Sequence, residues 1–158
     1  MQSRDPLAYF AYFAVSTYQF FSFLHQSVCL QFSTFNKMSR LSEELRQRTK
    51  NYASAIIRFY VNLPKEREEV RVLGKQLLRS GTSVAAHARE SSRARSETEF
   101  CSKLDGLLQE ADESQLWLEL LRADCGITGE QLENLLRETG ELMAIFITMV
   151  SKLRKAGH

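Results

Sequence analysis

The chain has 158 residues, enough for a single domain with a substantial hydrophobic core. Its hydrophobic content of 44% and charged content of 25% are ordinary for a soluble globular protein. The formal net charge is only +2, so total charge gives no argument for nucleic-acid binding, which has to come from where the charges lie. Proline and glycine are scarce and β-branched alternation is almost absent, which predicts an all-α fold. The three cysteines, Cys29, Cys101 and Cys125, fit no disulfide framework, which indicates reduced thiols in a cytoplasmic protein.

Residues 1–37 differ in composition from everything after them. They hold three of the 40 charged residues but ten of the 16 aromatic ones. Three interpretations are open: a translated region upstream of a true start at Met38, a poorly ordered or interaction-prone tail, or a membrane or export segment. The apolar run 8–24 spans 17 positions, the lower limit for a membrane helix, and no basic run precedes it. We therefore expect residues 1–37 to form an extension outside the domain, which is residues 38–158.

The first two expected helices lie on either side of Pro64. One runs from near Ser42 to Asn62 and stops at Leu63, because the residue before a proline avoids the α region. The other continues from after Pro64 to about Ser92. This second helix is rich in small residues between positions 80 and 88, so we expect another helix backbone to approach it closely.

Two capping boxes predict where the last two helices begin. Ser96 and Glu99 form the S-x-x-E pattern, which starts a helix that runs to about residue 123. Gly126 suits the left-handed turn that follows. Thr128 and Gln131 form a second box, T-x-x-Q, before the last helix. Four helices with short links predict an antiparallel up-down-up-down four-helix bundle.

The sequence lacks the constellations that would make such a bundle an enzyme. A di-metal site needs Glu-x-x-His on two helices, whereas His87 and Glu90 stand in the reverse order and are better explained as an i, i+3 pair. Cys101 has no visible orienting group for nucleophilic chemistry. No phosphate-binding loop or nucleophile elbow occurs. We therefore predict a protein without catalytic activity, metal or cofactor.

Basic residues concentrate on the second helix. Between positions 67 and 95 lie seven basic and three acidic side chains. Steps of four place several of the basic ones on one helix face. We refer to this set as the basic stripe and predict that it binds nucleic-acid phosphates; it comprises Arg71, Lys75, Arg79, Arg89 and Arg93. The alternative is a solvated face whose charges form local ion pairs.

The last helix is apolar on every side between Leu142 and Val150, apart from Thr148. A monomeric bundle leaves one face of each helix in water, so a helix of this kind predicts burial against a partner chain. The expected subunit interface consists of Leu142, Ile145, Phe146, Ile147 and Met149. The alternative is that Ile145 and Ile147 are ordinary exposed apolar residues.

Several segments together resemble a known family. They are L-L-R-S-G-T-S-V-A-A at 77–86, S-x-x-E-F at 96–100, K-L at 103–104 and E-x-x-x-S-x-x-W-L-E-L-L at 110–121. The chain resembles, over about residues 41–155, the bacterial "four helix bundle protein" family, also called the 23S rRNA intervening-sequence proteins. This family includes accessory variability proteins of diversity-generating retroelements. One departure is His87, where the family usually has Asn in an A-N-x-x-E segment.

The resemblance implies a homopentamer with a basic surface that binds nucleic acid, RNA or DNA, as an accessory to a reverse transcriptase. Together with the basic stripe, it predicts a non-enzymatic oligomer that binds nucleic acid without base specificity. The alternative is a structural or interaction bundle that has a protein partner and binds no nucleic acid. Neither interpretation involves a membrane.

The change in composition at Met38 generates a first prediction. A chain of residues 38–158 should be soluble and unfold cooperatively, at the same temperature and with the same oligomer size as the full chain. Thermal unfolding and sedimentation of both chains measure this. Loss of soluble folded protein on truncation would instead make the aromatic segment part of the core.

Overall fold

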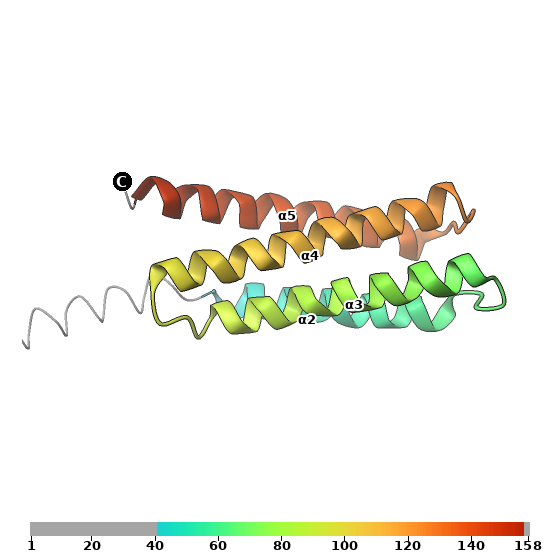
Figure 1. Cartoon of the computed structure of the whole chain (residues 1–158), viewed down its shortest axis with the longest axis horizontal. Helices are drawn as coiled ribbons and strands as arrows, with labels where there is room; N and C mark the ends of the chain where they lie inside the picture. Colours follow the sequence, from blue (N-terminus) through green and yellow to red (C-terminus); the bar gives the residue numbers. More distant parts are fainter. Residues whose placement is uncertain (1–40, 157–158) are drawn as a thin grey trace, which may run out of the picture. The chain divides into compact units, whose positions relative to one another are not determined.

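The structure is a computed structural model that describes residues 41–156; our expectations for residues 1–37 lie outside this range. The described residues form four helices and no strand. Successive helices run antiparallel, which confirms the predicted all-α up-down-up-down bundle (Figure 1). The bounds are α2 (Glu43–Asn62), α3 (Glu68–Ser91), α4 (Glu97–Ala123) and α5 (Glu130–Ala156).

The ends of the helices follow the local chemistry of the sequence. The backbone N–H of Leu45 donates to Ser42 Oγ, 3.2 Å away, at the start of α2. The backbone N–H of Glu99 donates in the same way to Ser96 Oγ at 3.0 Å, which confirms Ser96 as the cap of α4. The Glu99 carboxylate reaches back to the backbone N–H of Arg95, one residue earlier than a regular capping box requires. Both caps satisfy N–H groups that the helix itself leaves unpaired.

The predicted box at Thr128 and Gln131 is wrong. Helix α5 begins at Glu130, and the backbone N–H groups of Leu132 and Glu133 donate to the carbonyl of Gly129. Gly129 has φ +135°, a conformation open to glycine, so the chain enters the helix one residue later than a Thr128 cap would allow. The turn before it is as expected, with Gly126 left-handed at φ +64°.

The core lies along one seam of buried residues on each helix. On α4 the seam consists of Phe100, Leu104, Leu107, Ala111, Ser114, Leu118 and Leu121. On α3 the buried positions include Val70, Leu77, Gly81, Val84 and Ala88. Steps of three and four residues keep these side chains on one stripe of each helix, so the four stripes meet inside the bundle. None of the helices in the described part is long and apolar enough to cross a membrane.

Two pairs of hydroxyl groups lie inside this apolar core. Tyr52 Oη and Thr139 Oγ1 are 2.9 Å apart, and Ser114 Oγ donates to Ser80 Oγ at 2.9 Å. All four residues are buried, and each comes from a different helix. Burial raises the pKa of the Tyr52 phenol, whereas hydrogen bonds to Thr139 and Ser114 act in the opposite direction. The phenol is therefore neutral, and the four hydroxyls form one polar layer across the bundle.

Helices α2 and α3 approach each other closely where α3 has glycine. A Cβ atom placed on Gly81 would lie 2.8 Å from Cγ1 of Ile56, and one on Gly74 would lie 2.8 Å from Cδ1 of Leu63. Ile56 is fully buried and cannot move aside. The small-residue run in α3 thus lets the backbone of α3 come against α2, as the sequence predicts.

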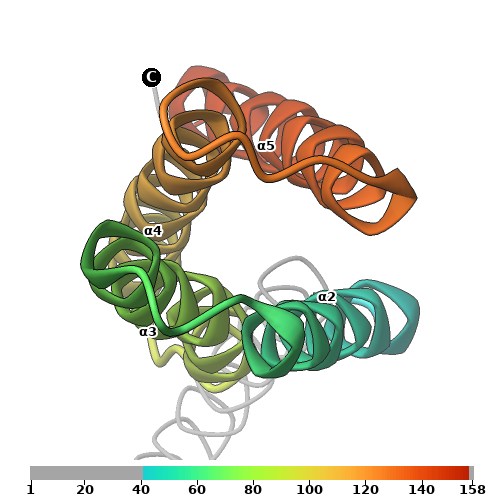
Figure 2. The ribbon, with the colours of Figure 1, turned by 90° about the vertical axis from the view of Figure 1, so that its right-hand side faces the viewer.

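The helices follow one another in chain order around an arc, with α3 and α4 between α2 and α5 (Figure 2). Of the four neighbouring pairs, α2 and α5 make the fewest contacts. An ion pair joins them on the surface: Arg48 donates from Nε to Glu138 at 2.7 Å and from Nη2 to Glu138 and Glu141. The bundle is therefore tight along three pairs of helices and looser along the fourth.

The close approach at Gly81 generates a second prediction. Gly81→Ala should lower the free energy of unfolding by about 1–3 kcal/mol, because the added methyl group overpacks against Ile56. Gly140→Ala is the matched control. An added Cβ there meets nothing within 4 Å, so this change should raise stability by about 0.5–1 kcal/mol through helix propensity. Chemical denaturation of both variants measures the difference, and equal effects would contradict the close packing.

Candidate nucleic-acid interface

The structure places four residues of the basic stripe on the solvent face of α3 and the fifth, Arg93, in the turn after the helix ends at Ser91. All five side chains are exposed, and the four on α3 lie on the side of the helix opposite its buried stripe. From Arg71 to Arg89 the stripe extends about 27 Å at 1.5 Å per residue. A line of cations of this length can follow the phosphates of a nucleic-acid strand.

Only part of the stripe is available for a ligand. Arg71 donates from Nε to Glu68 Oε2 at 2.8 Å, and this ion pair raises the pKa of Arg71. Arg79 donates to Glu113 of α4 at 2.8 Å. Within residues 41–155, Lys75, Arg89 and Arg93 have no carboxylate partner. The unpaired charge of the predicted site therefore lies on these three residues.

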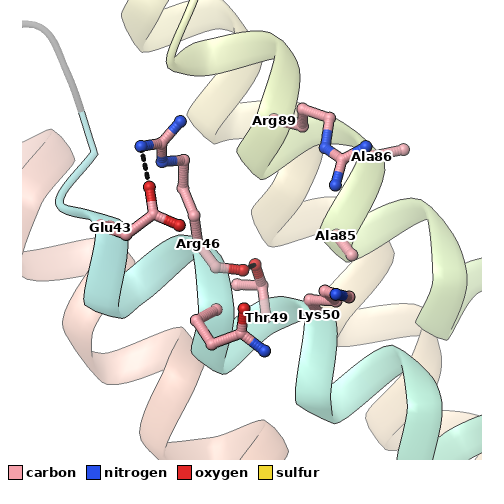
Figure 3. Close-up of a pocket in the computed structure, with 8 residues that line it drawn as sticks. Glu43, Arg46, Thr49, Lys50, Ala85, Ala86 and Arg89 are labelled. Carbon is pink, nitrogen blue, oxygen red and sulfur yellow. Dashed lines mark hydrogen bonds and ion pairs between the residues drawn. The ribbon is translucent and has the colours of Figure 1, made fainter.

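A surface recess between α2 and α3 adds two cations to Arg89. Its volume is about 510 Å³, and Arg46 and Lys50 of α2 line it from the side opposite Arg89 (Figure 3). The methyl side chains of Ala85 and Ala86 leave this space open. We call it the α2–α3 recess; its lining is Glu43, Arg46, Gln47, Thr49, Lys50, Ala85, Ala86 and Arg89. Three cations face one carboxylate in it, and that carboxylate, Glu43, is paired with Arg46.

Arg46 and Lys50 are the functional candidates that sequence reasoning missed. The two stand four residues apart, so they share one face of α2, but they lie outside residues 67–95, where the sequence concentrates its basic residues. Because α2 and α3 are antiparallel, the N-terminal half of α2 lies beside the C-terminal half of α3. This topology brings Arg46 and Lys50 to Arg89.

Acidic side chains border the stripe on its α4 side. Glu90 accepts a hydrogen bond from Lys103 of α4 at 2.8 Å, which lowers the pKa of Glu90. His87 Nδ1 lies 3.6 Å from the Glu90 carboxylate, close to it as predicted but beyond hydrogen-bond distance. On the α4 side, Glu113 thus pairs with Arg79 of α3, and Glu90 pairs with Lys103 of α4. Toward α2, in contrast, Arg89 and Lys50 have no carboxylate partner among the described residues.

The environment of Cys101 does not favour a nucleophile. Burial raises the pKa of the thiol, and the carboxylates of Glu97 and Asp105 act in the same direction. A thiolate, the reactive form, is thus disfavoured. Among the described residues, no three His, Cys, Asp or Glu side chains come together to hold a metal ion.

The predicted subunit interface divides into two groups. Leu142 and Phe146 are 0% exposed, so they pack in the bundle's own core and cannot contact a second chain. Ile145 and Met149 are half-buried, whereas Ile147 is 50% exposed. Leu142 and Phe146 were therefore wrongly predicted as interface residues, whereas for Ile145, Ile147 and Met149 an interface stays a prediction. Residues two apart on a helix do not share a face, so Ile147 lies on a different side of α5 from Ile145 and Met149.

Comparisons with known proteins agree with this architecture. A solved structure from Bacteroides thetaiotaomicron VPI-5482, a protein of unknown function from the S23 ribosomal protein family, is 37% identical with a TM-score of 0.60. The match covers 66% of this chain and 96% of that one. No curated protein matches. The model of the 23S rRNA-intervening sequence proteins matches residues 41–148, four helices and their links. The chain therefore belongs to the 23S rRNA-intervening sequence protein family.

Proposed function

We propose that this protein is a non-enzymatic, oligomeric four-helix bundle that binds nucleic acid through its phosphates. The observation that carries the proposal is the α2–α3 recess, where Arg46, Lys50 and Arg89 converge from two helices. Lys75 extends the same charge along α3, and Arg93 extends it into the turn that follows the helix. Guanidinium and ammonium groups are the usual partners of phosphate oxygens.

This mode of binding involves no recognition of base sequence. The stripe and the recess present cations on the surface of a helix pair, and phosphates look the same at every step of a strand. Each contact contributes little alone in physiological salt, because counterions compete for the phosphate. An oligomer presents several copies of the recess and converts weak contacts into avidity.

The unpaired cations generate a third prediction. Binding of a labelled RNA should weaken with salt, with a log–log slope of about −0.7 to −0.9 for each phosphate contact. The double variant Lys50→Gln/Arg89→Gln should weaken binding at low salt. It should also reduce the steepness of the log–log slope by the amount that about two phosphate contacts contribute. Fluorescence anisotropy across a salt series measures both quantities.

Arg71→Gln/Arg79→Gln is the matched control for that experiment. It removes two positive charges, as the recess variant does, but both arginines are already paired, with Glu68 and Glu113. We expect it to change affinity and slope less than the recess variant. Equal effects of the two variants would mean that only total charge matters. If the parent binds no RNA or DNA at low salt, the protein-partner function becomes the better one.

Apolar side chains that α5 leaves exposed or half-buried support self-association. Ile147 is 50% exposed, and Ile145 and Met149 lie beside it in sequence, half-buried. Burial of such side chains against another copy removes apolar surface from water. We propose a closed homo-oligomer on this basis, and the family resemblance implies five copies. The same resemblance implies a role beside a reverse transcriptase.

The oligomer generates a fourth prediction. Native mass spectrometry at micromolar concentration should show one discrete species larger than a monomer. Ile147→Glu should dissociate it, whereas Ile57→Glu, at a position of α2 with 45% exposure, should not. A monomeric parent would contradict the proposal, and so would an oligomer that tolerates the change at Ile147.

A further inference from the structure

A second concave site lies on the other side of α2, between α2 and α5. Its volume is about 490 Å³, within the range of small-molecule sites. It forms where the first and last helices of the bundle, which make the fewest contacts, are held together by Arg48 and its two carboxylate partners. Part of its lining is apolar: the half-buried Ala55, with Tyr52 and Leu135, which are 2% and 3% exposed, beneath it. We call this site the α2–α5 groove.

The polar lining of the groove is unusual for a surface between two helices. Three carboxamides line it, Asn51 from α2 and Gln131 and Asn134 from α5. Each carboxamide has both a donor and an acceptor group. Asn51 Oδ1 already accepts from Gln47, and Asn134 Oδ1 accepts from Arg137. The NH₂ groups of both amides, and the whole amide of Gln131, are therefore available to a ligand.

Two arginines complete the groove. Arg58 of α2 and Arg137 of α5 are exposed, and neither has a carboxylate partner among residues 41–155. The one carboxylate of the lining, Glu138, is bound by Arg48 at 2.7 and 2.9 Å. The groove is thus positively charged, with hydrogen-bonding amides and an apolar surface between them.

These groups match the chemistry of a nucleotide. A nucleobase has apolar faces and an edge of alternating donors and acceptors, which carboxamides can pair with, and its phosphate is a partner for arginine. In a duplex the faces are stacked and the pairing edge is occupied. We propose that the α2–α5 groove holds an unpaired nucleotide, with its base against the apolar lining and its phosphate at Arg58 or Arg137.

This inference rests on the proposed nucleic-acid binding and gives it a preference for single strands. The α2–α3 recess and the α2–α5 groove lie on the two flanks of α2, which is about 10–12 Å across with its side chains. A strand of a few nucleotides that crosses α2 reaches both. The recess then contributes phosphate contacts to any nucleic acid, whereas the groove contributes only to a strand with free bases.

The test measures how tightly the full chain binds a short RNA without self-complementarity, by fluorescence anisotropy. The RNA is used once as a single strand and once annealed to its complement. The parent should bind the single strand more tightly. Arg58→Ala/Asn134→Ala should weaken single-strand binding about tenfold, the value of one good base contact. Gln109→Ala/Arg122→Ala is the matched control, since it removes one charge and one amide from exposed positions of α4. On the duplex, groove and control variants should agree.

Three outcomes would overturn the inference while leaving the proposed function intact. In the first, the parent binds the single strand and the duplex with the same affinity. In the second, the groove variant and the control variant have the same affinity for each probe. Alternatively, the groove variant changes the oligomer size in sedimentation, which would make the groove a subunit contact. If the parent binds neither probe at low salt, both proposals are overturned. Thermal unfolding of each variant checks that the fold is retained.

Discussion

The hydrogen-bonded layer inside the bundle is the constraint on which the rest of the structure depends. Tyr52 pairs with Thr139, and Ser80 pairs with Ser114, so each of the four helices contributes one hydroxyl. A buried hydroxyl without a partner costs about 1–3 kcal/mol. Ser80, Ser114 and Thr139 also donate to backbone carbonyls of their own helices, so the Tyr52 hydroxyl is the group that would lose its partner if a helix slid or rotated by one position. The layer therefore favours one register, whereas interchangeable leucines would accept several.

That register determines which surfaces face the solvent. With Val84 and Leu77 inside, the basic stripe has to lie on the outer face of α3. The glycine at position 81 then brings α2 close enough for its own cations to join Arg89 at the α2–α3 recess. On the opposite flank, Glu113 of α4 pairs with Arg79, and Glu90 pairs with Lys103 of α4. The electrostatic asymmetry of α3 follows from the packing of its two neighbours.

The same geometry accounts for the position where this chain departs from the family pattern. His87 is bulkier than the usual Asn, and its imidazole lies against Gly106 of α4. A Cβ at position 106 would be 3.3 Å from Cε1 of the ring, closer than most such contacts. The absence of a side chain at Gly106 therefore makes room for the ring. An unusual residue on one helix is matched by a small one on the next.

The sequence by itself determined the helices and their inward faces, because both depend on local periodicity and caps. The seam from Phe100 to Leu121 and the cap at Ser96 are examples. The sequence pattern predicted the wrong start for α5, because the backbone of Gly129, not a threonine side chain, begins that helix.

Only the tertiary structure decided which charges act together. Arg46 and Arg89 are 43 positions apart in sequence and share a recess, whereas Arg79, predicted beside Arg89, is held by Glu113. Charge pairing and concavity arise between helices, so a count along one helix could not separate them. Likewise, Leu142 and Ile147 look alike in sequence, and only packing placed one inside and the other outside.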